Sequence, residues 1–392
     1  MFEIDKRIAH LSEDQIDDLM KKYYENVKAK DLVNEYNINI TASKLYTIFP
    51  PLKCENEICD HCGNPMYQER QSKTKYSWSK PKKFCPNCGH TSDSYCNCEH
   101  CQNKRREEQE RVRKERDEAI ERKKKIINQI YSYSGVDKKT MEELSTREKI
   151  YLGALFRAAL SEDMSKIEPL NSKELRLAPT LNYSEKIIDE LYENGVILVD
   201  VNSNIDAFSD DARSFNKFEV GFIVNFSKEQ YEDTITSLFV GNYIDIDNEE
   251  CLEVWRELAL EESLEYFQIS MQRVNFEFTP GKKTYEVFNQ FLEFFSVSQI
   301  YQIIYANIAK ATKYYQEGNI SKRQAANSVI TNSQSYCERA VAENWKLKQF
   351  YRDRECKESS LSQFLFSRII KIGDVGFNTK PHINCITENI YN

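Results

Sequence analysis

The sequence predicts a mainly α-helical protein of several domains with a small amount of β-structure. The chain has 392 residues, which is enough for roughly two to four domains of ordinary size. It contains only 11 glycines and 9 prolines, so long stretches can form uninterrupted helices. Eight of its 12 cysteines lie between Cys54 and Cys101, and this clustering sets the segment apart from the helical stretches around it.

The composition excludes several classes of protein. Hydrophobic residues make up 40% and charged residues 30%, which rules out a fully disordered chain and a collagen-like one. No run of about 18 apolar residues occurs, so we expect no membrane partner. The N-terminal sequence MFEIDKRIAHLSEDQ lacks the apolar stretch of a secretory signal. We therefore expect a cytoplasmic protein with reduced cysteines, in which clustered cysteines indicate metal rather than disulfides.

Residues 1–53 are expected to form three short helices, of which Thr41 or Ser43 caps the third and Pro50 ends it. The stretch LMKKYYENVKAKDLVNEYNINITASKLYTIFPP resembles the helix-turn-helix of resolvases, transposases and small repressors. The resemblance implies that the third helix, residues 41–47, reads DNA. Its expected contact residues are Ser43, Lys44 and Tyr46. The alternative is that these helices only cover the cysteine cluster. The local charge, 8 Lys and Arg against 9 Asp and Glu, does not decide between this alternative and DNA binding.

The cysteines of residues 54–101 have the spacing of zinc ligands. Two C-x2-C pairs, Cys59/Cys62 and Cys85/Cys88, are separated by 22 residues, and each pair is followed by a glycine. A C-x2-C turn aims two thiolates at one ion, and two such turns make the four-thiolate shell that Zn²⁺ favours. The run CPNCGH resembles a zinc-ribbon knuckle. We expect these four cysteines to form a first zinc site.

The remaining cysteines of the cluster can form a second zinc site, so that two four-cysteine sites use all eight. The four are Cys54, Cys96, Cys98 and Cys101. Their spacing is less regular, and His61, His90 or His100 can replace a cysteine, most readily His90 or His100. The number of zinc ions, one or two, stays open. An iron–sulfur cluster is the remaining alternative to zinc. Four filled positions leave no place for a water, so we expect structural rather than catalytic zinc.

A basic, aromatic loop lies between the two C-x2-C pairs, inside a protein of net charge −8. Residues 63–92 carry six Lys and Arg against Glu69 alone, with aromatic residues interleaved, as in KTKYSWSKPKKF. Lysines neutralise phosphates, and aromatic faces stack on bases. The predicted nucleic-acid contacts are Arg70, Lys73, Lys75, Tyr76, Trp78, Lys80, Lys82 and Lys83. The alternative is a ribbon hairpin whose aromatic residues cover the zinc and whose lysines are only solvated.

Three further segments follow. Residues 102–140 are expected to be a charged helical linker or a short pairing seam. Residues 141–230 combine helices with two strand-like runs, VILVDV and FEVGFIVNF. They resemble a winged helix, but the acidic wing at 202–217 favours packing or protein interaction. Residues 231–392 are expected to be a helical domain with a strongly acidic helix at 249–267. Parts of this last segment resemble uncharacterised bacterial proteins, which implies no chemistry.

These features predict a zinc-ribbon nucleic-acid-binding protein of a bacterium, phage or mobile element, with DNA as the expected target and a regulatory or defence role. Nucleic acid would bind through residues 10–101, and the C-terminal helical domain would bind a protein partner or a second copy of the chain. The sequence lacks phosphate-binding loops and hydrolase motifs, so an enzyme is not expected. Two alternatives stay open: an adaptor docking through its acidic helices, with purely structural zinc, and a nuclease-type effector using Asp200 and Glu219.

Overall fold

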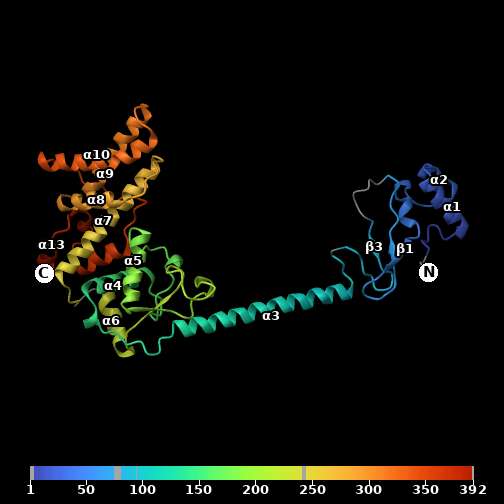
Figure 1. Cartoon of the computed structure of the whole chain (residues 1–392), viewed down its shortest axis with the longest axis horizontal. Helices are drawn as coiled ribbons and strands as arrows, with labels where there is room; N and C mark the ends of the chain where they lie inside the picture. The colour runs from blue at the N-terminus through green and yellow to red at the C-terminus, as the bar shows by residue number, and fades with distance from the viewer. Residues whose placement is uncertain (1–3, 75–80, 94, 241–243, 391–392) are drawn as a thin grey trace. The chain divides into compact units, whose positions relative to one another are not determined.

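Helices dominate the described part of the chain, and two small antiparallel sheets accompany them (Figure 1). The predicted class, mainly α with small β, is therefore confirmed. The computed structural model describes residues 4–74, 81–93, 95–240 and 244–390. These residues form two units, Met1–Ala119 and Ile120–Asn392, which are described in turn.

The first unit begins with α1 (Glu13–Tyr24) and α2 (Ala29–Glu35). Ser12 caps α1, because its side chain accepts the amide N–H of Gln15 while the Gln15 side chain accepts the amide N–H of Ser12. A small core closes around these helices. Its fully buried side chains are Ile8, Leu19, Leu32 and Leu45.

The third helical element of the first unit is a 3-10 helix, Ala42–Ile48, where the sequence predicts a DNA-reading α-helix. The segment is short, because β-branched Ile40 and Thr41 precede it and Pro50 follows it closely.

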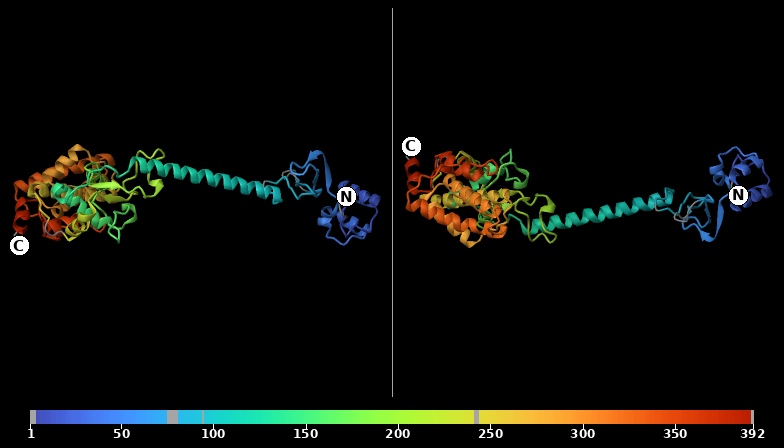
Figure 2. Two further views of the ribbon diagram at one scale, coloured as in Figure 1. Left: turned by 90° about the horizontal axis from the view of Figure 1, so that it is seen from below. Right: turned by 90° about the horizontal axis from the view of Figure 1, so that it is seen from above.

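A three-stranded antiparallel sheet follows in the order β1 (Leu52–Ile58), β2 (Pro65–Gln68) and β3 (Lys83–Phe84). After it comes α3 (Glu99–Ile130), a single helix of 32 residues that is drawn unbroken in both views of Figure 2. Most of its side chains are exposed, and Arg111 forms ion pairs with Glu108 and Glu115 along its surface. The charged segment expected from the sequence is therefore helical, with mostly exposed side chains.

The second unit contains most of the helices and one hairpin. Its elements are α4 (Thr146–Ala159), α5 (Leu181–Glu193), β4 (Ile197–Val199), β5 (Phe222–Val224), α6 (Lys228–Val240), α7 (Asn248–Arg273), α8 (Lys282–Phe294), α9 (Val297–Gln316), α10 (Lys322–Ala342), α11 (Ser360–Phe364), a π-helical turn (Leu365–Ile369), α12 (Val375–Asn378) and α13 (Ile383–Ile390). The hairpin pairs Ile197 with Val224 and Val199 with Phe222. The two strands predicted on either side of the wing therefore pair with each other.

One hydrophobic core runs through the second unit. Its largest fully buried side chains come from both halves of the unit, for example Tyr151 on α4 and Trp255 on α7. The boundary expected between residues 230 and 231 therefore does not separate two cores. The reason is close packing between distant helices: Gly153 on α4 leaves room for the ring of Phe364 on α11, where a Cβ would overlap it.

The acidic residues of α7 lie largely against cations of the same unit. Glu257 contacts Arg147 at 2.9 Å and Lys186 at 2.8 Å. Two further pairs join α7 to more distant segments, Glu262 with Arg352 and Glu265 with Arg176. Much of the negative charge that the sequence places on α7 is therefore compensated inside the fold.

Candidate metal centre

Two similar turns, residues 59–62 and 85–88, present the C-x2-C cysteines, and we call them the cysteine turns. In each, the glycine after the second cysteine donates its N–H to the carbonyl of the first. The bonds Gly63 to Cys59 and Gly89 to Cys85 are both 2.9 Å long. Both glycines have a φ of 70°, the left-handed region in which a side chain is strained. The glycine that follows each pair is thus explained by the backbone.

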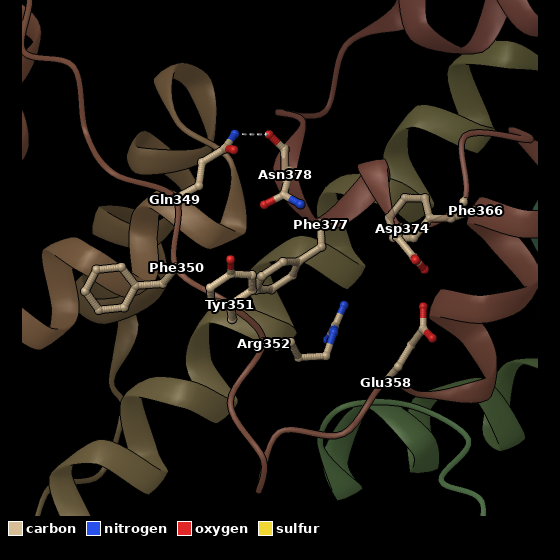
Figure 3. Close-up of a pocket in the computed structure, with 10 residues that line it drawn as sticks. Gln349, Phe350, Tyr351, Arg352, Glu358, Phe366, Asp374, Phe377 and Asn378 are labelled. Atoms are coloured by element: carbon tan, nitrogen blue, oxygen red, sulfur yellow. Dashed lines mark hydrogen bonds between the residues drawn. The ribbon is translucent and has the colours of Figure 1, made fainter.

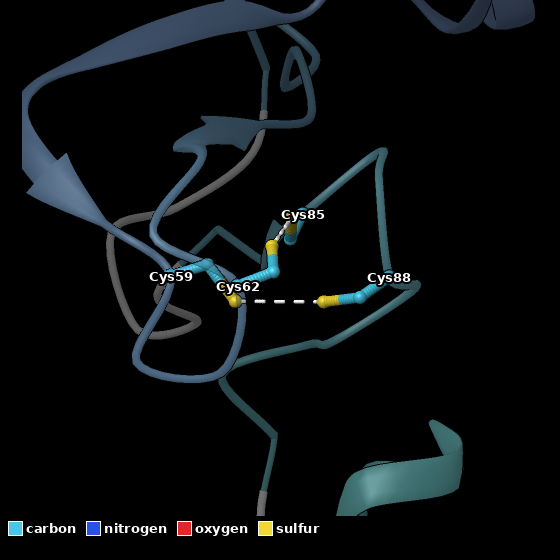
Figure 4. A group of neighbouring side chains, drawn as sticks. All are labelled: Cys59, Cys62, Cys85 and Cys88. Atoms are coloured by element: carbon cyan, nitrogen blue, oxygen red, sulfur yellow. Dashed lines mark hydrogen bonds between the residues drawn. The ribbon is translucent and has the colours of Figure 1, made fainter.

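The first ligand group consists of Cys59, Cys62, Cys85 and Cys88, the four residues predicted for the first site (Figure 4). Their sulfurs all lie within 4.8 Å of one another. Cys59 Sγ is 3.5 Å from Cys88 Sγ, and Cys62 Sγ is 3.3 Å from Cys85 Sγ. Around a tetrahedral zinc ion with bonds of about 2.3 Å, sulfurs are about 3.8 Å apart. The group therefore has the size of a four-thiolate zinc site.

The sulfurs of the first ligand group differ in their electrostatic surroundings. Hydrogen bonds from Asn64, whose Nδ2 lies 3.4 Å from Cys62 Sγ, lower the pKa of Cys62 to about 6. Burial raises the pKa of Cys88 to about 12. Zinc binds thiolates rather than thiols, so a bound ion would favour the ionised form of all four.

The second ligand group consists of His61, His90, Cys98 and Cys101, whose ligand atoms also lie within 4.8 Å of one another. Cys101 Sγ is 3.3 Å from His61 Nε2 and 3.4 Å from His90 Nδ1. Cys98 Sγ is 3.7 Å from His90 Nδ1. Nitrogen and sulfur ligands of tetrahedral zinc are about 3.6 Å apart, so two histidines and two thiolates match a zinc site here.

The second ligand group differs from the all-cysteine set expected from the sequence. Cys54 packs beside the first ligand group instead. Cys96 is buried next to the second group, and its sulfur accepts the N–H groups of Thr91 at 3.1 Å and Cys98 at 3.5 Å. Burial alone would raise the pKa of Cys96, but these donors lower it to about 5.

In the second ligand group, His61 and His90 stand where we expected Cys54 and Cys96. His90 was among the favoured replacements, whereas His61 was not. The position of His61 inside a C-x2-C pair is the signal that could have found it. His61 also packs against two other imidazoles, with ring centroids 4.1 Å from His90 and 3.9 Å from His100.

The residues predicted to read DNA lie on the 3-10 helix. Ser43 and Lys44 are exposed, whereas Tyr46 is half-buried against the small core of the first unit. Four residues of the basic loop fall outside the described part of the chain. They are Lys75, Tyr76, Trp78 and Lys80.

The other four basic residues of the loop contact their own unit. Arg70 Nε donates to the Pro50 carbonyl at 2.9 Å, and Lys73 Nζ lies 4.9 Å from the centre of the Tyr23 ring. Two lysines form ion pairs, Lys82 with Asp93 at 3.2 Å and Lys83 with Glu57. Pairs at the surface contribute roughly 1 kcal/mol or less, so a phosphate can compete for these lysines.

Asp200 and Glu219, the residues of the nuclease alternative, line one cavity of about 490 Å³ together with Lys166. The Asp200 carboxylate is only 3% exposed and lies 3.5 Å from Lys166 Nζ. Within the described ranges, the metal-sized groups are the two ligand groups above, and neither includes these carboxylates. Asp200 is thus an ion-paired buried acid.

A second cavity of the second unit, about 440 Å³ in volume, lies between the segment before α11 and the start of α12 (Figure 3). Arg352 lies in it with its guanidinium 4.4 Å from the centre of the Phe377 ring, and it pairs with the buried Glu262 at 2.8 Å. Glu358 and Asp374 also line this cavity. The sequence offers no motif that would have pointed to it.

Comparisons with known proteins add no relative. No family model matches the chain, no curated protein matches it, and no solved structure matches it. Within the described residues, no helix is both long enough and apolar enough to cross a membrane. A function must therefore be inferred from the site itself rather than from the fold.

Proposed function

We propose that this chain is a structural-zinc protein whose metal-binding segment contacts nucleic acid. One observation carries the proposal: eight ligand atoms form two groups of tetrahedral size within residues 59–101. Each group has four protein ligands and leaves no position for a substrate or a water, so zinc here stabilises the fold. Zinc binding supplies folding energy to a small unit with few buried side chains, and this unit has two small cores.

The distribution of charge supports a polyanionic partner for this part of the chain. Residues 1–101 are nearly balanced overall, with 14 Lys and Arg against 15 Asp and Glu, but residues 63–92 within them contain six Lys and Arg against Glu69 alone. Residues 131–392 contain 29 Lys and Arg against 40 Asp and Glu. Lys44 is exposed on the 3-10 helix, and Lys82 keeps 64% of its side chain exposed despite its ion pair. Cations near the metal-binding segment can release counterions from phosphates.

The finer part of the proposal concerns the target. We propose DNA, read by the helical segment before the sheet as in helix-turn-helix proteins, in the cytoplasm of a bacterium or in a phage or mobile element. Because the third element is a seven-residue 3-10 helix, we expect few base contacts and mainly phosphate contacts. Binding should therefore depend weakly on sequence and strongly on salt.

Fluorescence anisotropy with labelled single- and double-stranded oligonucleotides tests this proposal. The double variant Lys44→Ala/Lys82→Ala should weaken binding for every sequence and flatten the dependence of the Kd on salt. The matched control is Lys282→Ala/Lys313→Ala, which removes two lysine side chains of the second unit that are 91% and 75% exposed. No binding at low salt, or an equal effect of both double variants, contradicts the proposal.

An adaptor in a multi-protein assembly is the second candidate. The observation that favours it is the contact of Arg70, Lys73, Lys82 and Lys83 with their own unit, which reduces the number of free cations. One version of the adaptor hypothesis has the acidic face of α7 bind the partner. The ion pairs of α7 within its own unit argue against this version. Recovery of a protein partner that resists nuclease treatment, with no oligonucleotide bound, would favour the adaptor.

A further inference from the structure

The two ligand groups are interleaved along the chain. The first cysteine turn supplies two thiolates to the first ligand group and His61 to the second. The second cysteine turn supplies two thiolates to the first ligand group, and His90 follows Cys88 by two residues. Each cysteine turn therefore connects both metal positions.

The backbone bonds that close the cysteine turns also fix the histidines. The N–H of Cys85, a ligand of the first group, donates to the carbonyl of His90 at 2.7 Å. In the first turn the N–H of Cys59 donates to the carbonyl of Asn64 at the same distance, so that His61 lies inside a closed loop. Both imidazoles are thus positioned by the backbone that the first ligand group holds.

The other half of the second ligand group comes from the start of α3. Cys98 directly precedes the helix, and Cys101 lies in its first turn. The N–H of Gln102 donates to the Cys98 carbonyl at 3.0 Å. Arg105 Nη2 donates to the Cys96 carbonyl at 2.6 Å. An ion in the second ligand group therefore joins this helix start to both cysteine turns.

The loops that must close differ between the two groups. The first ligand group needs one loop between two local pairs of cysteines. The second gathers ligands from three separate segments, around His61, His90 and residues 98–101. Each closure costs conformational entropy, and two of the three segments are ordered once the first ligand group is filled. The first group, which needs fewer closures, therefore has the higher affinity in the metal-free chain, and each ion then strengthens the binding of the other by the same factor.

We propose that two zinc ions bind in a fixed order, in which the first ligand group fills first and its ion strengthens binding at the second. The second ion then cross-links the start of α3 to the two cysteine turns. This inference rests on the proposed zinc binding, and it is independent of whether the chain contacts nucleic acid. A chelator should remove the second ion first and free the helix start while the cysteine turns stay intact.

Titration of the full chain with Zn²⁺ tests the order. The protein is stripped of metal under reducing conditions and titrated in competition with a chromophoric chelator. The wild type should bind two ions, and His61→Ala/His90→Ala should bind one, with the affinity of the first ion unchanged. The matched control His100→Ala changes an exposed histidine that contacts His61 outside the ligand group, and it should still bind two.

The decisive variant is Cys59→Ser/Cys88→Ser, which leaves every ligand of the second group in place. We expect it to weaken binding at the second group by about 100-fold, within the usual range for strongly coupled sites. One ion bound with the wild-type affinity of the second group would overturn the proposal. Loss of both ions in His61→Ala/His90→Ala would overturn it as well, because the order would then run in the other direction.

Hydrogen exchange on the wild type keeps the proposal testable where a variant fails to fold. After one equivalent of Zn²⁺, the amides of Gly63 and Gly89 should be protected, and the amide of Gln102 should become protected only with the second equivalent. Protection of all three amides after the first equivalent of Zn²⁺ contradicts the proposed order of binding. These readouts contain no nucleic acid, so failure of the proposed nucleic-acid contact leaves them unchanged.

Discussion

His61 Nε2 lies 3.3 Å from Cys101 Sγ, although 40 residues separate the two in the sequence. The first belongs to a cysteine turn and the second to the first turn of α3. This contact joins the three parts of the metal-binding segment: two cysteine turns and a helix start. A count of cysteines alone misses the two histidines of the second ligand group, His61 and His90.

The composition of the second ligand group predicts opposite results for two cysteine variants. Cys98→Ser removes a ligand and should lower the zinc content by one ion per chain, because serine is a poor ligand for zinc. Cys54→Ser should keep two ions, since Cys54 packs beside the first ligand group without belonging to it. Elemental analysis of both proteins checks this. Loss of one ion in Cys54→Ser would restore the four-cysteine assignment.

Gly89→Ala should weaken zinc retention through the backbone of the second cysteine turn. The alanine would occupy a φ of 70°, which costs about 1–2 kcal/mol and corresponds to a fall in zinc affinity of roughly 5–30-fold. Chelator competition measures the change. Gly281→Ala is the matched control, because Gly281 has a φ of −114° with open space around it. Equal zinc affinities in the two variants would show that this turn carries no strain.

Gly153→Ala should destabilise the second unit, although alanine is normally the better helix former. A Cβ at this position would overlap the Phe364 ring, and overpacking typically costs about 1–3 kcal/mol. Urea unfolding of the second unit should therefore show a lower free energy of unfolding than the wild type. The control is Ser335→Ala, a substitution at an exposed position inside α10 of the same unit. An increase in stability would mean that the contact between α4 and α11 is looser than described.

Arg147→Met should also destabilise the second unit, because it leaves Glu257 with Lys186 as its remaining ion-pair partner. Removal of one partner from a mostly buried pair costs about 2–3 kcal/mol after allowance for the remaining lysine. Lys282→Met, in the exposed pair with Glu286 on α8 of the same unit, should leave the free energy of unfolding nearly unchanged. Urea unfolding compares the two, and similar losses would argue against a network that holds α4 to α7.

The stability of the second unit should depend on pH through Asp353. Two hydrogen bonds from Arg273, both 2.7 Å, hold the pKa of this carboxyl below its usual value. The stabilisation is therefore present above the unfolded-state pKa and is lost as the pH falls through the lower folded-state pKa. Asp353→Asn should lower the free energy of unfolding by about 1–2 kcal/mol at pH 7, and by progressively less as the pH falls through the folded-state pKa.

Asp374→Asn is the control for this pH dependence, because Asp374 is exposed in the cavity of Figure 3. Its free energy of unfolding should equal that of the wild type at pH 7 and at acidic pH. If Asp353→Asn lowers the free energy of unfolding by the same amount at low pH as at pH 7, the effect comes from packing rather than from the charge of the carboxylate.

The sequence predicted helices well where caps and apolar spacing agree. The acidic helix expected at 249–267 is an example, since α7 spans Asn248–Arg273 and Asp247 caps it by accepting the N–H of Glu250. The first ligand group was also predictable, because a C-x2-C turn is a local structure with its own glycine signal. Local patterns of this kind need no knowledge of the rest of the fold.

The second ligand group and the shared core of the second unit could not be predicted in the same way. His61, His90 and Cys101 meet only because β1–β3 bring the two cysteine turns together and α3 starts beside them. The sequence likewise gave Arg147 no sign that its partner would be Glu257 on α7. Such long-range contacts depend on packing, which periodicity and spacing do not record.

Elemental analysis together with native mass spectrometry of the purified 392-residue chain gives the number and the identity of the metal ions that it binds. We expect two zinc ions per chain, reduced to one in His61→Ala/His90→Ala. A chain without stoichiometric metal, a chain that contains iron, or a zinc content that this double substitution leaves unchanged would contradict this expectation.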